Sequence, residues 1–228
     1  MSGPDAGEEH RIQVPRTARY RTLGPPDAPE LWIVIHGYGQ LARRFVRRFA
    51  PIDDGSRRIV APEALSRFYA GNERGRHGAG SVVGATWMTR EARETEIADY
   101  VRYLDLLLER EDPAGRPLIV LGFSQGVATA ARWAVMGRVR PDRLVLWADF
   151  LPPDLPTDGA RARLGGLDLV LVRGDTDRAL ADPARAEAEA GQLAEAGLEP
   201  RRVRYAGGHD IDAAVLGRLA AEPMRPGG

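Results

Sequence analysis

The stretch PLIVLGFSQGVATAARWAVM, residues 117–136, decides the fold of this 228-residue chain. It begins with a continuous apolar run, typical of a strand buried on both faces, and ends in a run of small residues that predicts a helix over 127–136. Between the two stands GFSQG at 122–126, a GxSxG sequence whose outer glycines leave space for a sharp turn. We therefore predict that Ser124 projects its hydroxyl above a sheet, at a helix N-terminus that favours negative charge.

Other short β-rich runs predict further strands. Most of these runs are continuous, whereas the last one alternates between apolar and polar residues and suits the edge of a sheet. The runs lie at 31–35, 58–61, 143–148, 167–174 and 201–206, and residues 20–23 can add an antiparallel strand.

Helical spacing of apolar residues predicts helices between the strands, each after a residue that can accept hydrogen bonds from the first amides. These helices lie at 90–110 after Thr89, at 183–196 after Asp182 and at 211–221 after Asp210. The alternation predicts the α/β class, with a mostly parallel sheet and helices on both faces.

The chain has the length of one domain, which we place at 17–222, between flexible segments at 1–16 and 223–228. One long irregular stretch, at 62–88, contains several aromatic and glycine residues. Loops of this length in a compact domain are usually functional.

Composition excludes several classes of function. The 32 basic side chains, all arginine, balance 32 acidic ones, and this zero net charge disfavours binding to nucleic acid or to an anionic membrane. Without cysteine or lysine, the chain has no thiolate metal site, disulfide, cysteine nucleophile or Schiff base. A polar N-terminus, and no window approaching about 18 apolar residues, predict a cytoplasmic protein without a membrane span.

A serine nucleophile needs a base, and the chain has four histidines. His10 lies in the N-terminal segment, His36 ends a predicted strand and is expected to be structural, and His77 lies in the long irregular stretch, where it could touch substrate. His209 follows the last strand in GGHD, where two glycines give the backbone freedom to aim an imidazole. We predict His209 as the base.

The base in turn needs an acid that holds the imidazole in its useful tautomer. Asp175 and Asp177 follow the predicted strand at 167–174, and Asp149 follows the strand at 143–148. Asp175 is expected to start the turn and accept backbone amides, which favours Asp177, but these residues alone leave all three candidates open.

Acyl transfer also needs amides that face the oxyanion. HGYGQ at 36–40 follows the first core strand, and its glycines let backbone N–H groups approach a ligand. We predict that the amides of Tyr38 and Gln125 form an oxyanion hole.

Four motifs together resemble the phospholipase/carboxylesterase family of the α/β-hydrolase superfamily, which includes acyl-protein thioesterases. The resemblance spans about residues 31–220 and implies the α/β-hydrolase fold in a minimal form, without a separate cap domain. It also implies a serine hydrolase that cleaves carboxylic esters or thioesters and needs neither cofactor nor metal. The motifs are HGYG at 36–39, GFSQG at 122–126, the GxxDxxL run at 174–180 and GGH at 207–209.

Position by position, the resemblance implies Ser124 as nucleophile, Asp177 as acid and His209 as base. The family usually has Asp or Gly where Gln40 stands, a departure that concerns the substrate rather than the triad. The expected partner is a small-molecule ester or thioester, and the chain could form a homodimer. For the substrate pocket we predict an apolar lining from Tyr38, Phe68, Tyr69, Trp87 and Phe150.

Two other functions fit parts of the sequence. GYGQLA at 37–42 fits the GxGxxA pattern of dinucleotide-binding oxidoreductases, with Glu63 near the place of a ribose-binding acid. A non-catalytic, hydrolase-like binding module would have the fold without the activity. A separate feature is the set of arginines in the segment 43–48, which we expect on a solvated helix face, with attraction of an anionic ester or acyl-chain headgroup as the alternative.

Overall fold

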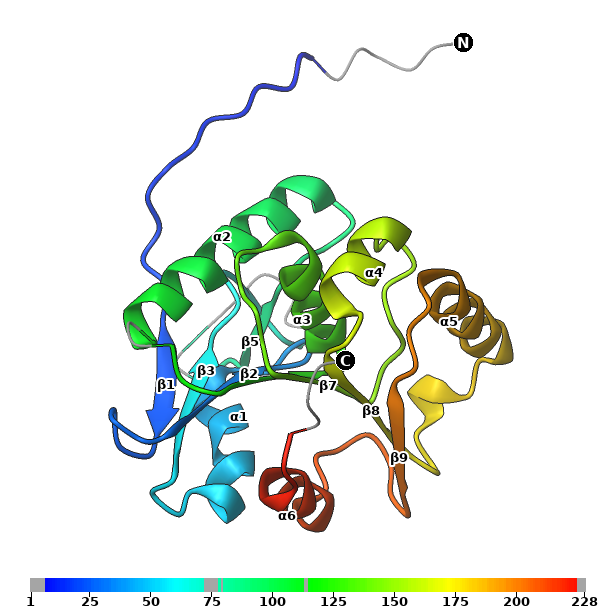
Figure 1. The fold of residues 1–228 in the computed structure, drawn as a ribbon. Coiled ribbons are helices and arrows are strands. Elements are labelled where there is room, and N and C mark those ends of the chain that lie inside the picture. The colour runs from blue at the N-terminus through cyan, green and yellow to red at the C-terminus, as the bar shows by residue number, and fades with distance from the viewer. Residues whose placement is uncertain (1–6, 72–77, 79, 113–114, 225–228) are drawn as a thin grey trace.

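A central sheet of seven strands runs through the molecule in the order β1-β3-β2-β6-β7-β8-β9 (Figure 1). The structure is a computed structural model that describes residues 7–71, 78, 80–112 and 115–224. Every neighbouring pair in the sheet is parallel except β1 with β3, which confirms the predicted mostly parallel sheet with one antiparallel strand. The strands are β1 (Tyr20–Leu23), β2 (Glu30–Ile35), β3 (Arg57–Pro62), β6 (Leu118–Phe123), β7 (Arg143–Trp147), β8 (Asp168–Gly174) and β9 (Arg201–Tyr205).

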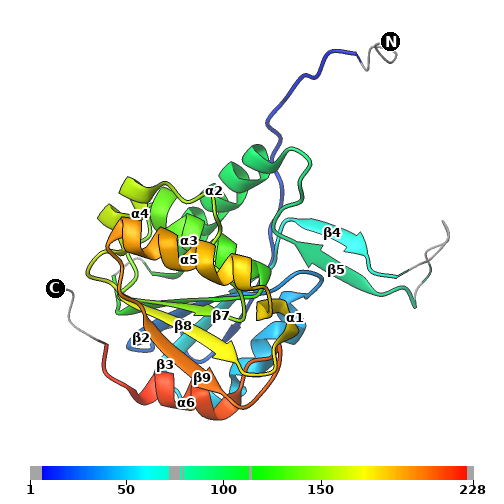
Figure 2. The ribbon, with the colours of Figure 1, turned by 90° about the vertical axis from the view of Figure 1, so that its right-hand side faces the viewer.

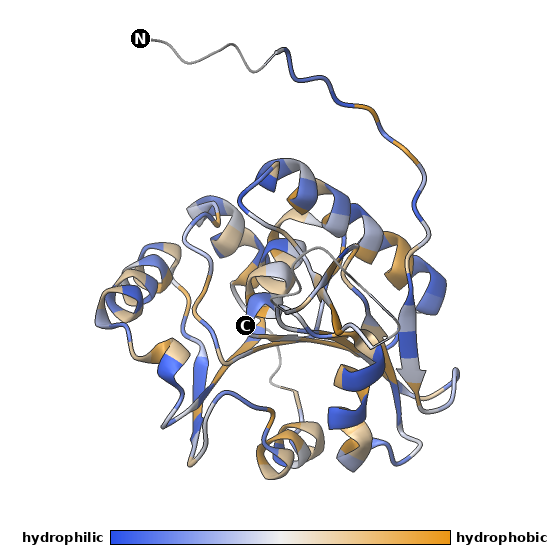
Figure 3. Ribbon diagram, turned by 180° about the vertical axis from the view of Figure 1, so that it is seen from behind, coloured by the Kyte–Doolittle hydropathy of each residue, from blue (hydrophilic) through white to orange (hydrophobic). Residues whose placement is uncertain are grey.

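Helices cover both faces of this sheet, as predicted (Figure 1). One face carries α2, α3, α4 and α5, and the other carries α1, the 3₁₀ helix η1 and α6. The strands are apolar between helices whose outer sides are polar (Figure 3), so a separate hydrophobic core lies on each face. The helices are α1 (Ala42–Phe45), η1 (Val46–Ile52), α2 (Arg93–Glu111), α3 (Gln125–Met136), α4 (Thr157–Leu164), η2 (Arg178–Leu180), α5 (Pro183–Ala196) and α6 (Ala213–Ala221).

The stretch 62–88 is not irregular throughout, contrary to the prediction. It contains the antiparallel strands β4 (Ser66–Tyr69) and β5 (Val83–Thr86), which extend away from the body of the molecule (Figure 2). Tertiary contact holds this hairpin: the Gly39 amide donates to the Ala85 carbonyl at 2.8 Å. A Cβ atom on Gly84 would lie 2.8 Å from the Gly39 carbonyl oxygen. Local sequence patterns contain no signal for such a contact.

Two helix starts differ from the predictions. Thr89 is not the cap of α2, because Ala92 adopts a left-handed φ of 46° and the helix begins only at Arg93. The Thr89 amide instead donates to the Glu96 carboxylate. In α6 the capping side chain is Asp212, which accepts from the amide of Val215 at 2.8 Å.

Asp210 does not cap α6, because that helix begins only at Ala213. The Asp210 carboxylate instead accepts from the Ile211 amide at 2.8 Å and pairs with Arg48 at 2.8 Å. The predicted Asp182 cap of α5 is confirmed, since its carboxylate accepts from the amides of Ala184 and Arg185. Helix α4 was not predicted, and α3 begins two residues earlier than expected, at Gln125.

In the part of the chain that the structure describes, no helix has the length and apolarity needed to cross a membrane. Residues 7–17 are all exposed. The single domain at 17–222, the flexible terminal segments, a homodimer and the cytoplasmic location stay predictions.

Candidate active site

Ser124 lies on a tight turn between β6 and α3, with φ 54° and ψ −123°. Both outer glycines of the motif are needed there. A Cβ atom on Gly126 would lie 2.3 Å from the Ile35 carbonyl oxygen, and one on Gly122 would lie 2.3 Å from the carbonyl oxygen of Gly126. Positive φ is unfavourable for a serine, so the surrounding packing holds Ser124 in this strained conformation above the sheet.

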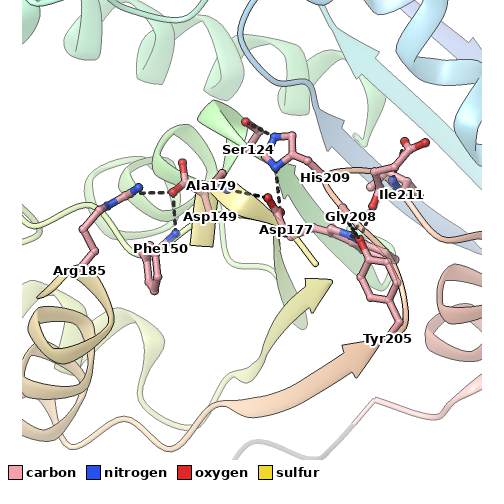
Figure 4. A network of polar contacts seen from close by, with 12 residues as sticks. Ser124, Asp149, Phe150, Asp177, Ala179, Arg185, Tyr205, Gly208, His209 and Ile211 are labelled. Carbon is pink, nitrogen blue, oxygen red and sulfur yellow. Dashed lines mark hydrogen bonds and ion pairs between the residues drawn. The ribbon is translucent and has the colours of Figure 1, made fainter. Parts of the chain in front are cut away.

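His209 joins Ser124 to Asp177 through two hydrogen bonds (Figure 4). Its Nε2 lies 2.9 Å from the Ser124 Oγ, and its Nδ1 lies 2.8 Å from the Asp177 Oδ2. The Asp177 side chain is 0% exposed, whereas that of His209 is 38% exposed. Ser124 is partly exposed, so the arrangement runs from a buried carboxylate to a serine that is open to solvent in part.

Local contacts hold Asp177 and His209, which follow the neighbouring strands β8 and β9. Asp177 follows β8 and uses its second oxygen to accept from the Ala179 amide at 2.9 Å. The His209 ring packs on Phe123, with 5.1 Å between ring centroids. The loops after β8 and β9 touch, because a Cβ atom on Gly174 would lie only 2.4 Å from the Gly207 carbonyl oxygen.

The other two candidate acids are bound elsewhere. Asp175 pairs with Arg204 at 2.7 Å, rather than accepting backbone amides as expected. Asp149 accepts from Arg185 at 2.7 Å and from the Phe150 amide at 2.8 Å (Figure 4). Of the three candidates, the structure brings Asp177 to His209.

The loop 36–40 lies against the serine turn. A Cβ atom on Gly37 would lie 3.0 Å from the Ser124 Cβ. The Gly37 amide is bound by the side-chain oxygen of Gln40 at 2.9 Å, and the Gly39 amide is bound by Ala85. Within the described residues, the amides of Tyr38 and Gln125 have no hydrogen-bond partner, as an oxyanion hole requires.

His36 is buried and bound to backbone groups, as the sequence predicts. Its Nδ1 lies 2.8 Å from the Gly37 carbonyl oxygen, and its Nε2 accepts from the Ala64 amide at 3.0 Å. Burial lowers its pKa to about 4, although the Gly37 hydrogen bond and the charge of Glu63 act in the opposite direction. A neutral His36 therefore fastens the start of the loop 36–40 to the chain after β3.

The predicted pocket residues fall into two groups. Tyr38 is 62% exposed and stacks on Phe68 at 5.1 Å between ring centroids, and Tyr69 is also exposed. Trp87 and Phe150 are buried. The role of all five in a substrate pocket stays a prediction, and His77 lies outside the described residues.

The two buried aromatic residues make specific contacts close to the site. The Trp87 indole donates to the His36 carbonyl at 2.8 Å. The Phe150 ring contacts the guanidinium groups of Arg173 and Arg185, whose carbon atoms are 4.5 and 4.8 Å from its ring centroid. Trp87 therefore supports the loop 36–40, and Phe150 packs against two arginines.

Sequence reasoning assigned only the amide of Gln125 and missed its side chain. The Gln125 Nε2 donates to the Thr86 hydroxyl at 2.9 Å and to the Met88 carbonyl at 3.0 Å, and its Oε1 accepts from the Trp87 amide at 3.2 Å. The side chain thus fastens the end of β5 to the serine turn. The available signal was a long amide side chain directly after the candidate nucleophile, with several hydrogen-bonding groups to satisfy.

Among the described residues, no cluster of three or more His, Asp or Glu side chains could hold a metal ion. Ser124, His209 and Asp177 instead form a compact set of hydrogen-bonded groups. This arrangement can activate a hydroxyl for attack on an electrophilic carbon.

No family model matches the chain, and no curated protein matches it either. Among solved structures it is similar to the esterase PE8, with 20% identity and a TM-score of 0.64 over 90% of this chain and 97% of the other. The acyl-protein thioesterase 2 of Zea mays has 18% identity and a TM-score of 0.65 over 90% and 97% of the two chains. A carboxylesterase of Bacillus cereus has 15% identity and a TM-score of 0.61 over 90% and 92%. With the sheet topology, these similarities show that the chain has the α/β-hydrolase fold.

Proposed function

We propose that this protein is a serine hydrolase of the phospholipase/carboxylesterase type, which cleaves carboxylic esters or thioesters. The observation that carries the proposal is the pair of hydrogen bonds from His209 to Ser124 and Asp177. This nucleophile, base and acid set is the recurring solution for acyl transfer. The names of the solved structures, which include esterases and a thioesterase, agree with it.

The Nδ1–H of His209 donates to Asp177, which leaves Nε2 as a lone-pair acceptor for the Ser124 proton. The Ser124 oxygen attacks the carbonyl carbon while Nε2 takes its proton, and Asp177 stabilises the resulting imidazolium. The tetrahedral intermediate then expels the alkoxide or thiolate, which takes the proton from Nε2. Water attacks the acyl-enzyme by the same sequence and releases the acid.

The oxyanion of the tetrahedral intermediate is held by the amides of Tyr38 and Gln125. Support for this assignment comes from the bonding of their neighbours: Gly37 and Gly39 have bound amides, whereas these two do not among the described residues. The Gln125 amide is also at the N-terminus of α3, where the helix dipole favours negative charge.

A dinucleotide-binding oxidoreductase fits the structure less well. A phosphate-binding loop presents glycine amides at the start of a substantial helix, but the Gly39 amide is bound by Ala85 and α1 spans only Ala42–Phe45. Glu63, the residue near the expected ribose acid, is buried and bound by Arg19 and Arg67. Burial alone would raise the pKa of Glu63, but these two arginines outweigh it and lower the pKa.

The test is labelling with a fluorophosphonate, which reacts with an activated serine. We expect one adduct per chain on wild-type protein and none on Ser124→Ala, with Ser66→Ala as the matched control that still reacts. A folded wild-type protein that does not react would overturn the proposal and favour a non-catalytic binding module. Esters and thioesters of graded acyl length then distinguish carboxylesterase from thioesterase activity.

A further inference from the structure

A cleft of about 210 Å³ opens between α1 and the start of β5. Its volume is below the roughly 300–1,000 Å³ of a site for a whole drug-sized ligand, so it suits one part of a substrate. We call it the arginine cleft. Its lining includes Gly39, Gln40, Leu41, Arg44, Phe45 and Arg48.

Two lining residues of the arginine cleft connect it to Ser124 and to the residue after His209. Gln40, one of its lining residues, binds the Gly37 amide, and Gly37 packs against Ser124. Arg48, another lining residue, pairs with Asp210, which directly follows His209. A ligand bound to Ser124 could therefore extend one substituent into the cleft.

The charge of the cleft is positive. Arg44 makes no ion pair with any described residue. The pair of Arg48 with Asp210 is open to solvent, since the two side chains are 50% and 56% exposed. Exposed pairs of this kind contribute about 0–1 kcal/mol, so Arg48 can rearrange to meet a ligand.

The buried residues Leu41 and Phe45 line the cleft together with the two arginines. This combination matches a short hydrocarbon segment that ends in an anion. Guanidinium groups bind carboxylate and phosphate oxygens through paired N–H donors, a geometry that few other side chains offer. Arg44 is exposed and hydrated in the free protein, so an apolar ester gains no ionic contact with it, whereas an anionic one does.

We propose that the arginine cleft binds an anionic group of the substrate, a carboxylate or a phosphate, and thereby selects esters or thioesters that carry such a group. The proposal rests on the serine hydrolase function proposed above. It assigns Arg44 as a specificity-determining residue and Arg48 as a second donor that exchanges its bond to Asp210 for one to the substrate.

The test compares pairs of esters that differ only in charge. For an anion on the acyl side, the pair is 4-nitrophenyl hemiglutarate and its methyl ester. For an anion on the alcohol side, it is 3-carboxyphenyl butyrate and its methyl ester. The quantity measured is the ratio of kcat/KM for the acid to kcat/KM for the methyl ester, which cancels changes common to both.

Arg44→Gln should lower this ratio about 5- to 30-fold for one of the two pairs, because a charge-assisted hydrogen bond is lost. The double variant Arg44→Gln, Arg48→Gln should lower it further. Arg43→Gln is the matched control: it removes the same charge one residue earlier, lines a different cleft and should change the ratio less than twofold. Inhibition of 4-nitrophenyl butyrate cleavage by glutarate and by inorganic phosphate identifies the preferred anion.

The outcomes separate the two proposals. Equal ratios in Arg44→Gln and Arg43→Gln, with the methyl esters still cleaved, would overturn the arginine cleft as a subsite and leave the hydrolase function intact. A wild-type protein that cleaves no ester of either pair and resists the fluorophosphonate would overturn both. Raising NaCl from 0.05 to 0.5 M should reduce the wild-type ratio, because salt screens exposed charges.

Discussion

His36 and His209 follow the ends of different strands, and each imidazole makes two hydrogen bonds, yet their surroundings differ. His36 is buried and bonds to the Gly37 carbonyl and the Ala64 amide. His209 is half-exposed and bonds to the side chains of Ser124 and Asp177. The same side chain is therefore a structural link in one loop and a candidate base in the other.

The comparison teaches that the partners, rather than the histidine, determine its role. Backbone groups do not change protonation near neutral pH, so the bonds of His36 can only position the chain. A serine hydroxyl and a carboxylate can exchange or stabilise a proton, so the bonds of His209 can support chemistry. Four predictions test this difference, in order of decreasing effect.

Removing the imidazole of His209 should abolish activity without unfolding the protein. We expect His209→Ala to lower kcat for a neutral ester by about 10⁴- to 10⁶-fold, because the serine loses its base. The free energy of unfolding, measured in urea, should change by about 1 kcal/mol or less, since the side chain is partly exposed. If the variant keeps more than a few per cent of the wild-type activity, the assignment of His209 as the base is wrong.

The assignment of Asp177 as the acid is tested by substituting Asp177 and its near neighbour Asp175. Asp177→Asn should lower kcat by about 10³- to 10⁴-fold, because the amide no longer stabilises the imidazolium or the useful tautomer. Asp175→Asn is the matched control, since its carboxylate pairs with the exposed Arg204, and it should change kcat threefold or less. Similar losses in both variants would contradict the assignment of Asp177.

For His36 the effect should be on stability. His36→Phe leaves the Gly37 carbonyl and the Ala64 amide without their partner, and each buried polar group left unpaired costs about 1–3 kcal/mol. Urea unfolding at pH 7 should show a total loss of about 2–6 kcal/mol, far above that of His209→Ala. Equal losses in the two variants would break the distinction between the histidines.

The lowered pKa of His36 also predicts a pH dependence of stability. Between its ordinary value of 6.5 and about 4, the unfolded chain binds a proton that the folded chain excludes, so stability falls as the pH falls. From pH 7 to pH 5 this loss should be about 2 kcal/mol, at about 1.4 kcal/mol for each unit below 6.5. The lowered pKa of Glu63 acts in the same direction but only below its ordinary value of 4.5.

Urea unfolding of wild-type protein and His36→Phe at pH 7 and pH 5 isolates this contribution. The wild-type protein should lose about 2 kcal/mol more than the variant between the two conditions. Equal losses would show that His36 is protonated in the folded protein at pH 5.

Local patterns predicted most strands and the one antiparallel strand, because each depends on a short apolar run and its neighbours. They also predicted the Asp182 cap, where Asp-Pro starts α5. They failed at Thr89, because the left-handed φ of Ala92 and the reach of Glu96 delay the start of α2. A cap depends on one backbone angle, which neighbouring residue types do not determine.

The hairpin of β4 and β5 was missed for a different reason. Its contact with Gly39 joins residues that are far apart in the chain, and the side chain of Gln125 adds three more such bonds. These contacts depend on the sheet, which brings the loops together. The prediction of an irregular stretch at 62–88 lacked that information.

The sequence by itself determined which side chains are chemically capable: without cysteine or lysine, a serine between two glycines and a histidine after two glycines were the candidates that remained. It also predicted the order of the strands in the central sheet along the chain, but not the hairpin of β4 and β5 or the helix α4. The residues alone left three aspartates open and the family resemblance implied Asp177, but only the tertiary structure brings that carboxylate to His209. The partners of His209 lie 32 and 85 positions away, and their contact depends on the order of strands in the sheet. For the same reason, only the folded chain forms the arginine cleft, because its lining joins Arg44 to Val83 of β5, which lies far along the chain.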